Sequence, residues 1–393
     1  MVTNNSDTKK RILIVHNKYN NLGGEDIAVS NEIRVLKKKY TVEILFFDNK
    51  ILKDFIFNII SIFTNKNFKS INLLKNSINT FSPDLIYIHN SWFKASNGVF
   101  SVCDKYNIPV VVKLHNFRYF CTKSYWIKGH IPLKKSHCKA CYMYRNEYQL
   151  FNKYFSNSLI KSFMVTRFGK KYFNILSKSN FYIFVLTEFH KQFLIKLGIQ
   201  SERIIVNHNP VEINSETESQ KEKKPYFLYA GRISNEKGLT ELIDSFIRAN
   251  LKNFDLIIAG DGPSLNKLRK KYYLQNITFL GQKNNNEIIN LIKNSRAVVT
   301  ATKIFEGQPT ILTEASINNT LSIFPITGGV PEFFPVDYKF KYEQNNYESL
   351  IKMMIDVAES KNTDDIKNEC KTHILSVLQE EKYFNNLEKV INN

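Results

Sequence analysis

Two glutamates, Glu306 and Glu314, stand eight positions apart on either side of a predicted helix start. Pro309 suits the first turn of a helix, which puts Glu306 in the preceding loop and Glu314 about one turn inside. Carboxylates in these places can accept hydrogen bonds from two sets of hydroxyl groups on one ligand, such as a sugar and a ribose. The alternative interpretation is two solvated glutamates beside a turn.

The start of the same helix predicts an anion site. The amides of Thr310, Ile311 and Leu312 have no carbonyl group one turn back, and the helix dipole lies behind them. A phosphate group is one ligand that such a helix end accepts.

A second segment, Tyr229 to Leu239, predicts a strand that ends in a glycine loop and leads into a helix. Arg232 and Lys237 bracket the loop, and a guanidinium fork beside an ammonium group suits a diphosphate. Only 10 of the 55 basic residues are arginines, which makes Arg232 less expected as background. A plain surface pair is the alternative.

Glycine and histidine positions in the first half add weaker signals. Gly23 and Gly24 follow the first predicted strand and would let the backbone approach a ligand, although most such pairs are only turns. His115 stands at the end of a strand, where a lone histidine is more often structural.

A cysteine cluster follows His115. Cys121, Cys138 and Cys141, with His130 or His137, supply four soft ligands for a structural zinc ion, and the C-x2-C spacing fits. Only one such pair exists, so we expect buried cysteines without metal and keep zinc as the alternative.

Short apolar runs alternate with helix-period segments, which predicts βαβ units and parallel sheets. The pattern indicates an α/β protein of two tandem doubly wound domains with a cleft between them. Residues 1–211 form the first domain, 212–224 a polar linker and 225–372 the second, and a closing helix over 373–393 is expected to pack back on the first. The predicted strands are 11–15, 42–47, 85–89, 110–115, 182–187, 204–207, 226–230, 255–259, 277–280, 297–300 and 321–324. The predicted helices are 26–39, 188–197, 238–249, 263–273, 286–293, 310–318 and 373–391.

Charge is distributed unevenly along the 393 residues. Residues 1–211 hold 32 Lys and Arg against 12 Asp and Glu, or +20, and the remainder holds 23 against 24, or −1. The first domain should therefore meet an anionic partner. A stripe of apolar residues at helical spacing (Leu52, Phe55, Ile56, Ile59, Ile60, Phe63) would suit a membrane interface, and packing on its own sheet is the alternative.

No apolar run is long enough for a membrane-spanning helix, and the N-terminus lacks the apolar segment of a secretory signal. We expect a cytoplasmic protein, peripheral on the inner face of the cell membrane. No motif for nucleic-acid binding accompanies the charge.

These motifs, in this order, resemble the retaining glycosyltransferases of family 4, which have the GT-B fold. The resemblance covers nearly the whole chain. It includes Gly23-Gly24-Glu25, the segment from His115 to Arg118, Thr187-Glu188, Asn209-Pro210, Gly231-Arg232 with Glu236-Lys237-Gly238, Gly260-Asp261-Gly262, the Glu306/Glu314 pair and Gly328-Gly329.

The resemblance implies a role for each matching residue. Arg232 and Lys237 bind the donor diphosphate, Glu306 contacts the donor sugar and Glu314 holds the ribose. His115 lies beside the transferred sugar, and Glu306, His115, Arg232 and Lys237 form the catalytic group. Donor contacts come from Gly23, Gly24, Gly231, Asp261, Gly307, Thr310, Ile311, Leu312 and Glu314.

The implied activity is retaining transfer of a hexose or N-acetylhexosamine from a nucleotide-sugar, with UDP favoured over GDP. A lipid-linked saccharide in surface-polysaccharide assembly is the expected acceptor. A soluble acceptor and a non-catalytic GT-B partner protein are the alternatives. No Asp-x-Asp motif follows a strand, so we expect no metal and no cofactor.

Overall fold

The computed structural model describes residues 9–18, 24–48, 64–92, 94–117, 119, 159–211 and 225–392. These residues fold as two compact units. The first comprises the described residues up to Pro210 together with those from Glu380 onward, and the second runs from Val211 to Gln379.

The first unit is built on a six-stranded parallel sheet in the order β2-β1-β3-β4-β5-β6. The order reverses at β1, which pairs with β2 on one side and β3 on the other, as in a doubly wound sheet. Its strands are β1 (Arg11–Lys18), β2 (Thr41–Asp48), β3 (Leu85–Asn90), β4 (Val110–Leu114), β5 (Tyr182–Val185) and β6 (Ile204–Val206).

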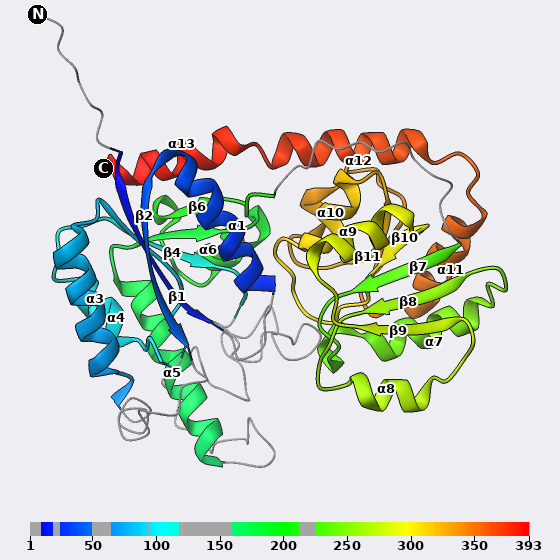
Figure 1. Ribbon diagram of the computed structural model, residues 1–393, viewed down its shortest axis with the longest axis horizontal. Coiled ribbons are helices and arrows are strands. Elements are labelled where there is room, and N and C mark those ends of the chain that lie inside the picture. The colour runs from blue at the N-terminus through cyan, green and yellow to red at the C-terminus, as the bar shows by residue number, and fades with distance from the viewer. Residues whose placement is uncertain are drawn as a thin grey trace, which may run out of the picture. The chain divides into compact units, whose positions relative to one another are not determined.

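Helices cover both faces of this sheet. The apolar sides of α1 and α13 share one core with residues such as Ile12, Tyr87 and Val111. Figure 1 shows α3, α4 and α5 together on the other side. The helices are α1 (Gly24–Lys39), α3 (Phe68–Phe81), α4 (Gly98–Cys103), α5 (Leu159–Lys178), α6 (Glu188–Lys196) and α13 (Glu380–Ile391).

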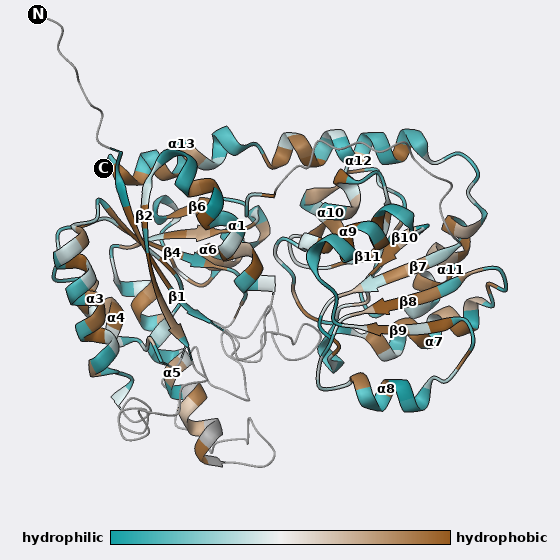
Figure 2. Ribbon diagram, viewed as in Figure 1, coloured by the Kyte–Doolittle hydropathy of each residue, from teal (hydrophilic) through white to brown (hydrophobic). Residues whose placement is uncertain are grey.

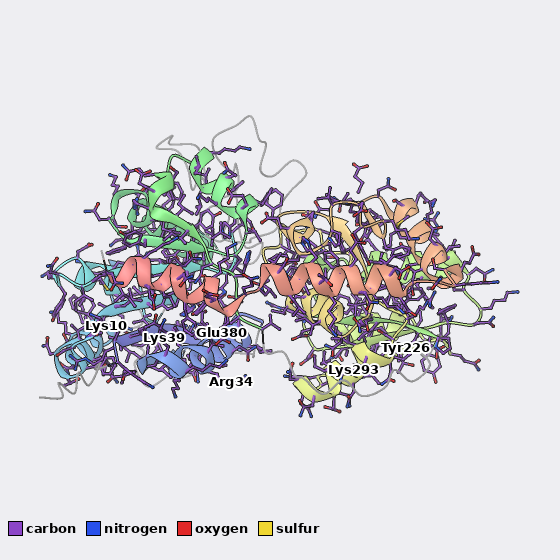
Figure 3. All side chains as sticks on the ribbon, turned by 90° about the horizontal axis from the view of Figure 1, so that it is seen from above. Lys10, Arg34, Lys39, Tyr226, Lys293 and Glu380 are labelled. Atoms are coloured by element: carbon purple, nitrogen blue, oxygen red, sulfur yellow. The ribbon has the colours of Figure 1, made fainter. Side chains whose placement is uncertain are left out.

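The C-terminal helix is held to the first unit by ion pairs with α1. Lys38 of α1 donates to Glu380 at 2.7 Å, and Lys39 pairs with Glu388. Figure 3 labels Lys39 and Glu380, one from each of the two helices. The last helix is therefore part of the first unit although it follows the second in sequence.

The second unit has a parallel sheet of the same size, in the order β12-β11-β10-β7-β8-β9. Its strands are β7 (Tyr226–Ala230), β8 (Asp255–Ala259), β9 (Ile277–Gly281), β10 (Ala297–Val299), β11 (Leu321–Ile326) and β12 (Lys341–Glu343). Its helices are α7 (Leu239–Ala249), α8 (Leu265–Lys271), α9 (Asn285–Asn294), α10 (Thr310–Ile317), α11 (Tyr347–Glu359) and α12 (Asp364–Val377). Figure 2 shows apolar β8 and β9 beside a mostly hydrophilic α8.

The structure differs from the sequence expectation in some elements. Strand β12 and helices α3, α4, α5 and α11 were not expected, and the expected helix over 373–391 is two helices, α12 and α13. The break falls at Leu378 and Gln379, because Leu378 caps α12 and the acidic pair Glu380-Glu381 favours a new helix start. Strand β12 has only three residues, too few for a recognisable period.

Several predicted features lie outside the described residues: the linker 212–224, the apolar stripe between Leu52 and Phe63, Gly23, and the cluster of Cys121, Cys138, Cys141, His130 and His137. In the described part of the chain, none of the helices combines the length and the hydropathy needed to cross a membrane.

Candidate functional site

Two glycine turns at the carboxyl ends of β7 and β8 bind each other in the second unit. The Gly231 amide donates to the Ala259 carbonyl at 3.0 Å, and the Ile233 amide donates to the Asp261 carbonyl at 2.8 Å. Gly260 has a φ of +142°, and a side chain on it would overlap the Gly231 carbonyl. The backbones of the two loops are therefore in close contact, which Gly260 permits because it has no side chain.

This contact leaves two predicted donor-binding side chains on the surface. Arg232 and Asp261 are both exposed. The Asp261 carboxylate accepts from the Gly262 amide at 2.7 Å, so it already stabilises its own turn. Arg232 is open to a ligand.

The loop that carries Glu306, between β10 and α10, is held from two sides by glycines with left-handed backbone. Gly238 has a φ of +68° and Gly328 a φ of +56°. A side chain on Gly238 would overlap the Ala301 carbonyl, and one on Gly328 would overlap the Glu306 carbonyl. The Gly329 amide also donates to Glu306 O at 2.9 Å. These contacts fix the backbone from which the Glu306 side chain extends.

Lys237 and Glu306 meet at the centre of this arrangement. The Lys237 Nζ atom donates to Glu306 Oε1 at 2.5 Å, and the Thr302 hydroxyl donates to the same oxygen at 2.9 Å. The side chains keep 28% and 22% of their surface exposed. Two residues far apart in sequence therefore form a partly open ion pair, whose ammonium group has further protons for an anion.

Glu314 lies on α10 in a different environment. Burial raises the pKa of Glu314 to about 7. In the part of the chain that the structure describes, no ion pair or hydrogen bond to its carboxylate offsets the loss of water. Glu314 is therefore partly buried, and its carboxylate is less solvated than that of an ordinary surface glutamate. A partly buried acceptor of this kind suits a ligand with hydroxyl groups.

The first turn of α10 provides fewer free amides than expected. Thr310 and Ile311 are the first two helical residues, as predicted, but the Leu312 amide donates to the Pro309 carbonyl at 3.0 Å. This bond joins residues three apart, so the first turn of α10 is tight. The Leu312 amide is therefore not free to bind an anion. Gly307 is buried in the preceding loop.

In the first unit, the described site residues lie at the start of α1 and directly after β4. Gly24 is the first residue of α1, and among the described residues no atom lies within 4 Å of a Cβ placed on it. His115 follows β4, and its Nε2 atom is 3.0 Å from His89 Nδ1. Asn116 beside it donates to Glu25 of α1 at 3.1 Å.

Beneath His115 lies a buried polar cluster that the sequence motifs do not predict. Glu32 Oε1 accepts from the Lys113 ammonium at 2.7 Å and from two tyrosine hydroxyls, Tyr87 at 2.7 Å and Tyr383 at 2.8 Å. We call these four residues the Glu32 network. The signal in the sequence was Lys113, the one charged residue within the apolar strand Val110–Leu114.

One metal-binding arrangement is conceivable within the described residues. Glu32, His89 and His115 place one potential ligand atom each within 4.8 Å of one another. The Lys113 ammonium already bonds to the Glu32 carboxylate and would repel a cation. The set therefore fits a hydrogen-bonded cluster better than a metal centre.

Comparisons with known proteins agree with this architecture. Residues 211–372 match the family model of glycosyl transferases group 1, which covers the second unit. A comparison with curated proteins finds no match. Among solved structures, Anabaena HepE in complex with UDP and glucose aligns with a TM-score of 0.67 at 13% identity, over 98% of this chain and 100% of that one.

Two other solved structures are similar over nearly their whole length. Sucrose-phosphate synthase from Thermosynechococcus elongatus has a TM-score of 0.68 at 12% identity and 98% coverage of both chains. The lipopolysaccharide outer core galactosyltransferase WaaB has 0.59 at 18%, covering 96% of this chain and 99% of that one. The fold is GT-B. The predicted fold class is confirmed, and the family model together with the GT-B fold supports a glycosyltransferase.

Proposed function

We propose that the chain transfers a hexose or N-acetylhexosamine from a nucleotide-sugar, with retention of configuration, to a lipid-linked saccharide in surface-polysaccharide assembly. The observation that carries the proposal is the convergence of Lys237 and Glu306, joined at 2.5 Å, in a unit that matches glycosyl transferases group 1. Exposed Arg232 and partly buried Glu314 complete the chemistry that a nucleotide-sugar needs: cations for the diphosphate and an acceptor for the ribose.

In this reaction each of the site residues has a specific role. The bond between the anomeric carbon and the diphosphate oxygen breaks, and the acceptor hydroxyl oxygen attacks from the same face. The hydroxyl proton passes to the leaving phosphate oxygen, so no protein nucleophile is used. Arg232 and Lys237 stabilise the negative charge that develops on the diphosphate. Glu306 and His115 act on the donor sugar, and the proposal needs no metal ion because the two cations serve the diphosphate.

A UDP-sugar is the preferred donor in this proposal. It is supported by solved structures of Anabaena HepE with UDP, with UDP-glucose, and with UDP and glucose, which share the fold over 98% of this chain. A GDP-sugar is the second choice.

A membrane-bound acceptor is supported by one face of α5. Ile160 and Phe163 are 68% and 50% exposed, and Arg167 and Lys171 follow at helical spacing. Burial lowers the pKa of Lys171, as do the neighbouring charges of Lys66 and Arg167, so three cations gather here. Apolar side chains beside clustered cations suit the inner, anionic leaflet of the cell membrane, where we place the protein.

Turnover of UDP- and GDP-sugars with a membrane extract as acceptor tests the activity. The wild type should consume one donor, with or without EDTA, and Glu306→Ala and Arg232→Ala should lower the rate about 100- to 1000-fold. Glu359→Gln, an exposed change on α11, is the matched control. No turnover and no nucleotide binding would favour a non-catalytic partner protein instead.

Flotation with liposomes tests the membrane surface separately. Arg167→Glu with Lys171→Glu should reduce binding to anionic vesicles, whereas Lys267→Glu with Lys270→Glu on α8 should not. Equal recovery of the wild type with neutral and anionic lipids would remove the electrostatic part of the proposal.

A further inference from the structure

The contact between His89 and His115 decides which nitrogen of His115 carries a proton. Burial holds the pKa of His89 well below the usual histidine value, and nearby Lys113 and His16 add to the effect. The pKa of His115 is lowered by burial first and then by His89 and Lys113. Both rings are therefore neutral at pH 7, with one proton each, and only one of them donates across the 3.0 Å contact.

Two arrangements of the ring protons are possible, and they differ in whether a buried N–H group is left without an acceptor. If His115 donates from Nε2, the His89 proton must sit on Nε2, which is buried and has no partner within the described structure. A buried N–H without an acceptor costs about 1–3 kcal/mol. If His89 donates from Nδ1, only a lone pair is left unpaired at its Nε2.

The carboxylate of Glu32 favours the second arrangement. Its Oε2 atom lies 3.8 Å from His89 Nδ1 and has no hydrogen-bond partner in the described residues. A proton on Nδ1 presents a positive end to this oxygen, whereas a lone pair there would be repelled. Lys113, Tyr87 and Tyr383 hold Glu32 through its other oxygen, so the orientation of the carboxylate is fixed.

We infer that His89 is a positioning residue that holds His115 in the Nδ1–H tautomer, so that His115 presents a hydrogen-bond donor to its ligand. The Glu32 network keeps His89 in place, and through Tyr383 the C-terminal helix α13 becomes part of this support. That the ligand is the donor sugar rests on the proposed function. The assignment of the tautomer does not depend on the proposed function.

Nitrogen NMR of protein labelled with ¹⁵N-histidine tests the tautomer directly. Long-range proton–nitrogen correlations tell a protonated ring nitrogen from a bare one, and His115→Gln assigns the signals. The expected spectrum shows His115 protonated on Nδ1 and neutral throughout the mildly acidic range, because Lys113 and His16 face the histidine pair and Glu32 is already bonded.

Two substitutions separate positioning from packing. The amide nitrogen of Asn stands in for Nδ1, so His89→Asn should keep the His115 signature. His89→Phe keeps a ring against Tyr87, whose centroid is 4.5 Å away, but donates nothing. It should shift the His115 proton toward Nε2 and lower kcat roughly 10- to 100-fold, a range seen for groups that fix a functional imidazole.

Each outcome bears on the inference. Protonation of His115 on Nε2 in the wild type would overturn it even if no variant folds, as would an unchanged His115 signal in His89→Phe. Stoichiometric zinc, lost in both His89 variants, would overturn it in favour of a metal centre. Absence of transfer from every donor would refute the proposed function alone, because the spectrum of the wild type still decides the tautomer.

Discussion

The two units place similar charges at their parallel sheets in opposite environments. In the first, the side chains of Lys113 and Glu32 are 0% exposed. In the second, Lys237 and Glu306 form the same kind of pair at 28% and 22% exposure. The buried Lys–Glu pair of the first unit therefore contributes to its packing and is out of reach of a ligand. The partly exposed pair of the second unit can contact one.

The carboxylates form a graded series. Glu32 accepts from three side chains, Glu306 accepts from Lys237 and Thr302, and the partly buried carboxylate of Glu314 is compensated by none of the described residues. A carboxylate that loses its partners on burial destabilises the fold, because its charge is left without compensation. The uncompensated residue is therefore where we expect a ligand to supply the missing hydrogen bonds.

The largest effect on stability is expected at the buried pair. Lys113→Met leaves Glu32 buried without its cation and should cost about 3–5 kcal/mol of unfolding free energy. Lys237→Met breaks a partly exposed pair and should change it by about 1 kcal/mol or less. Urea unfolding, with hydrogen exchange followed in peptides from each unit, measures both. Equal costs for the two variants would remove the contrast between the pairs.

Glu314→Gln should stabilise the empty protein at high pH. The pKa of about 7 lies above the ordinary value of 4.5, so ionisation above pH 7 costs the folded state about 3 kcal/mol. Because the folded state holds this proton more tightly, the wild type loses stability as pH rises from about 4.5 to about 7, and the variant does not. The gain should be full at pH 8 and absent below pH 4.5. Thermal unfolding across this range measures it, and a pH-independent difference would contradict the assigned cause.

A smaller effect than at Lys113 or Glu314 is expected from a glycine that supports the Glu306 loop. Gly328→Ala adds a methyl group that overlaps the Glu306 carbonyl, whereas Gly198→Ala has the same left-handed strain with open space around it. The first variant should lose about 1–3 kcal/mol more than the second, because the overlap must be relieved. It should also lose transfer activity, whereas Gly198→Ala should retain it. Equal stability and activity of the two variants would show that the loop moves freely.

Much of the second unit could be predicted from sequence because its signals are local. The strand Tyr226–Ala230 and the glycine turn after it follow from apolar periodicity and glycine placement. The position of Glu306 before α10 follows from Pro309. The contact between Lys237 and Glu306 does not, because it depends on how two distant loops pack around Gly238 and Gly328.

Less of the first unit could be predicted from the sequence, because its main polar contacts join residues that are far apart in the chain. Glu32 reads as an ordinary polar residue of a helix, and Tyr383 lies in a helix that follows the whole second unit. The hydrogen bond between Tyr383 and Glu32 depends on tertiary packing, which local sequence patterns do not predict. Helix α5 was missed although it is long and its buried residues Phe168, Tyr172 and Leu176 are spaced at helical intervals.

Calorimetric titration of UDP at pH 8 tests most directly the central claim that the second unit binds a nucleotide-sugar through its uncompensated carboxylate. The wild type and Glu359→Gln should bind UDP alike. Glu314→Gln should bind it about 10- to 100-fold more weakly, the loss of a hydrogen bond to a charged group, while remaining the more stable protein. Equal UDP affinity in Glu314→Gln and the wild type, or no binding of UDP or GDP by the wild type, would contradict the account.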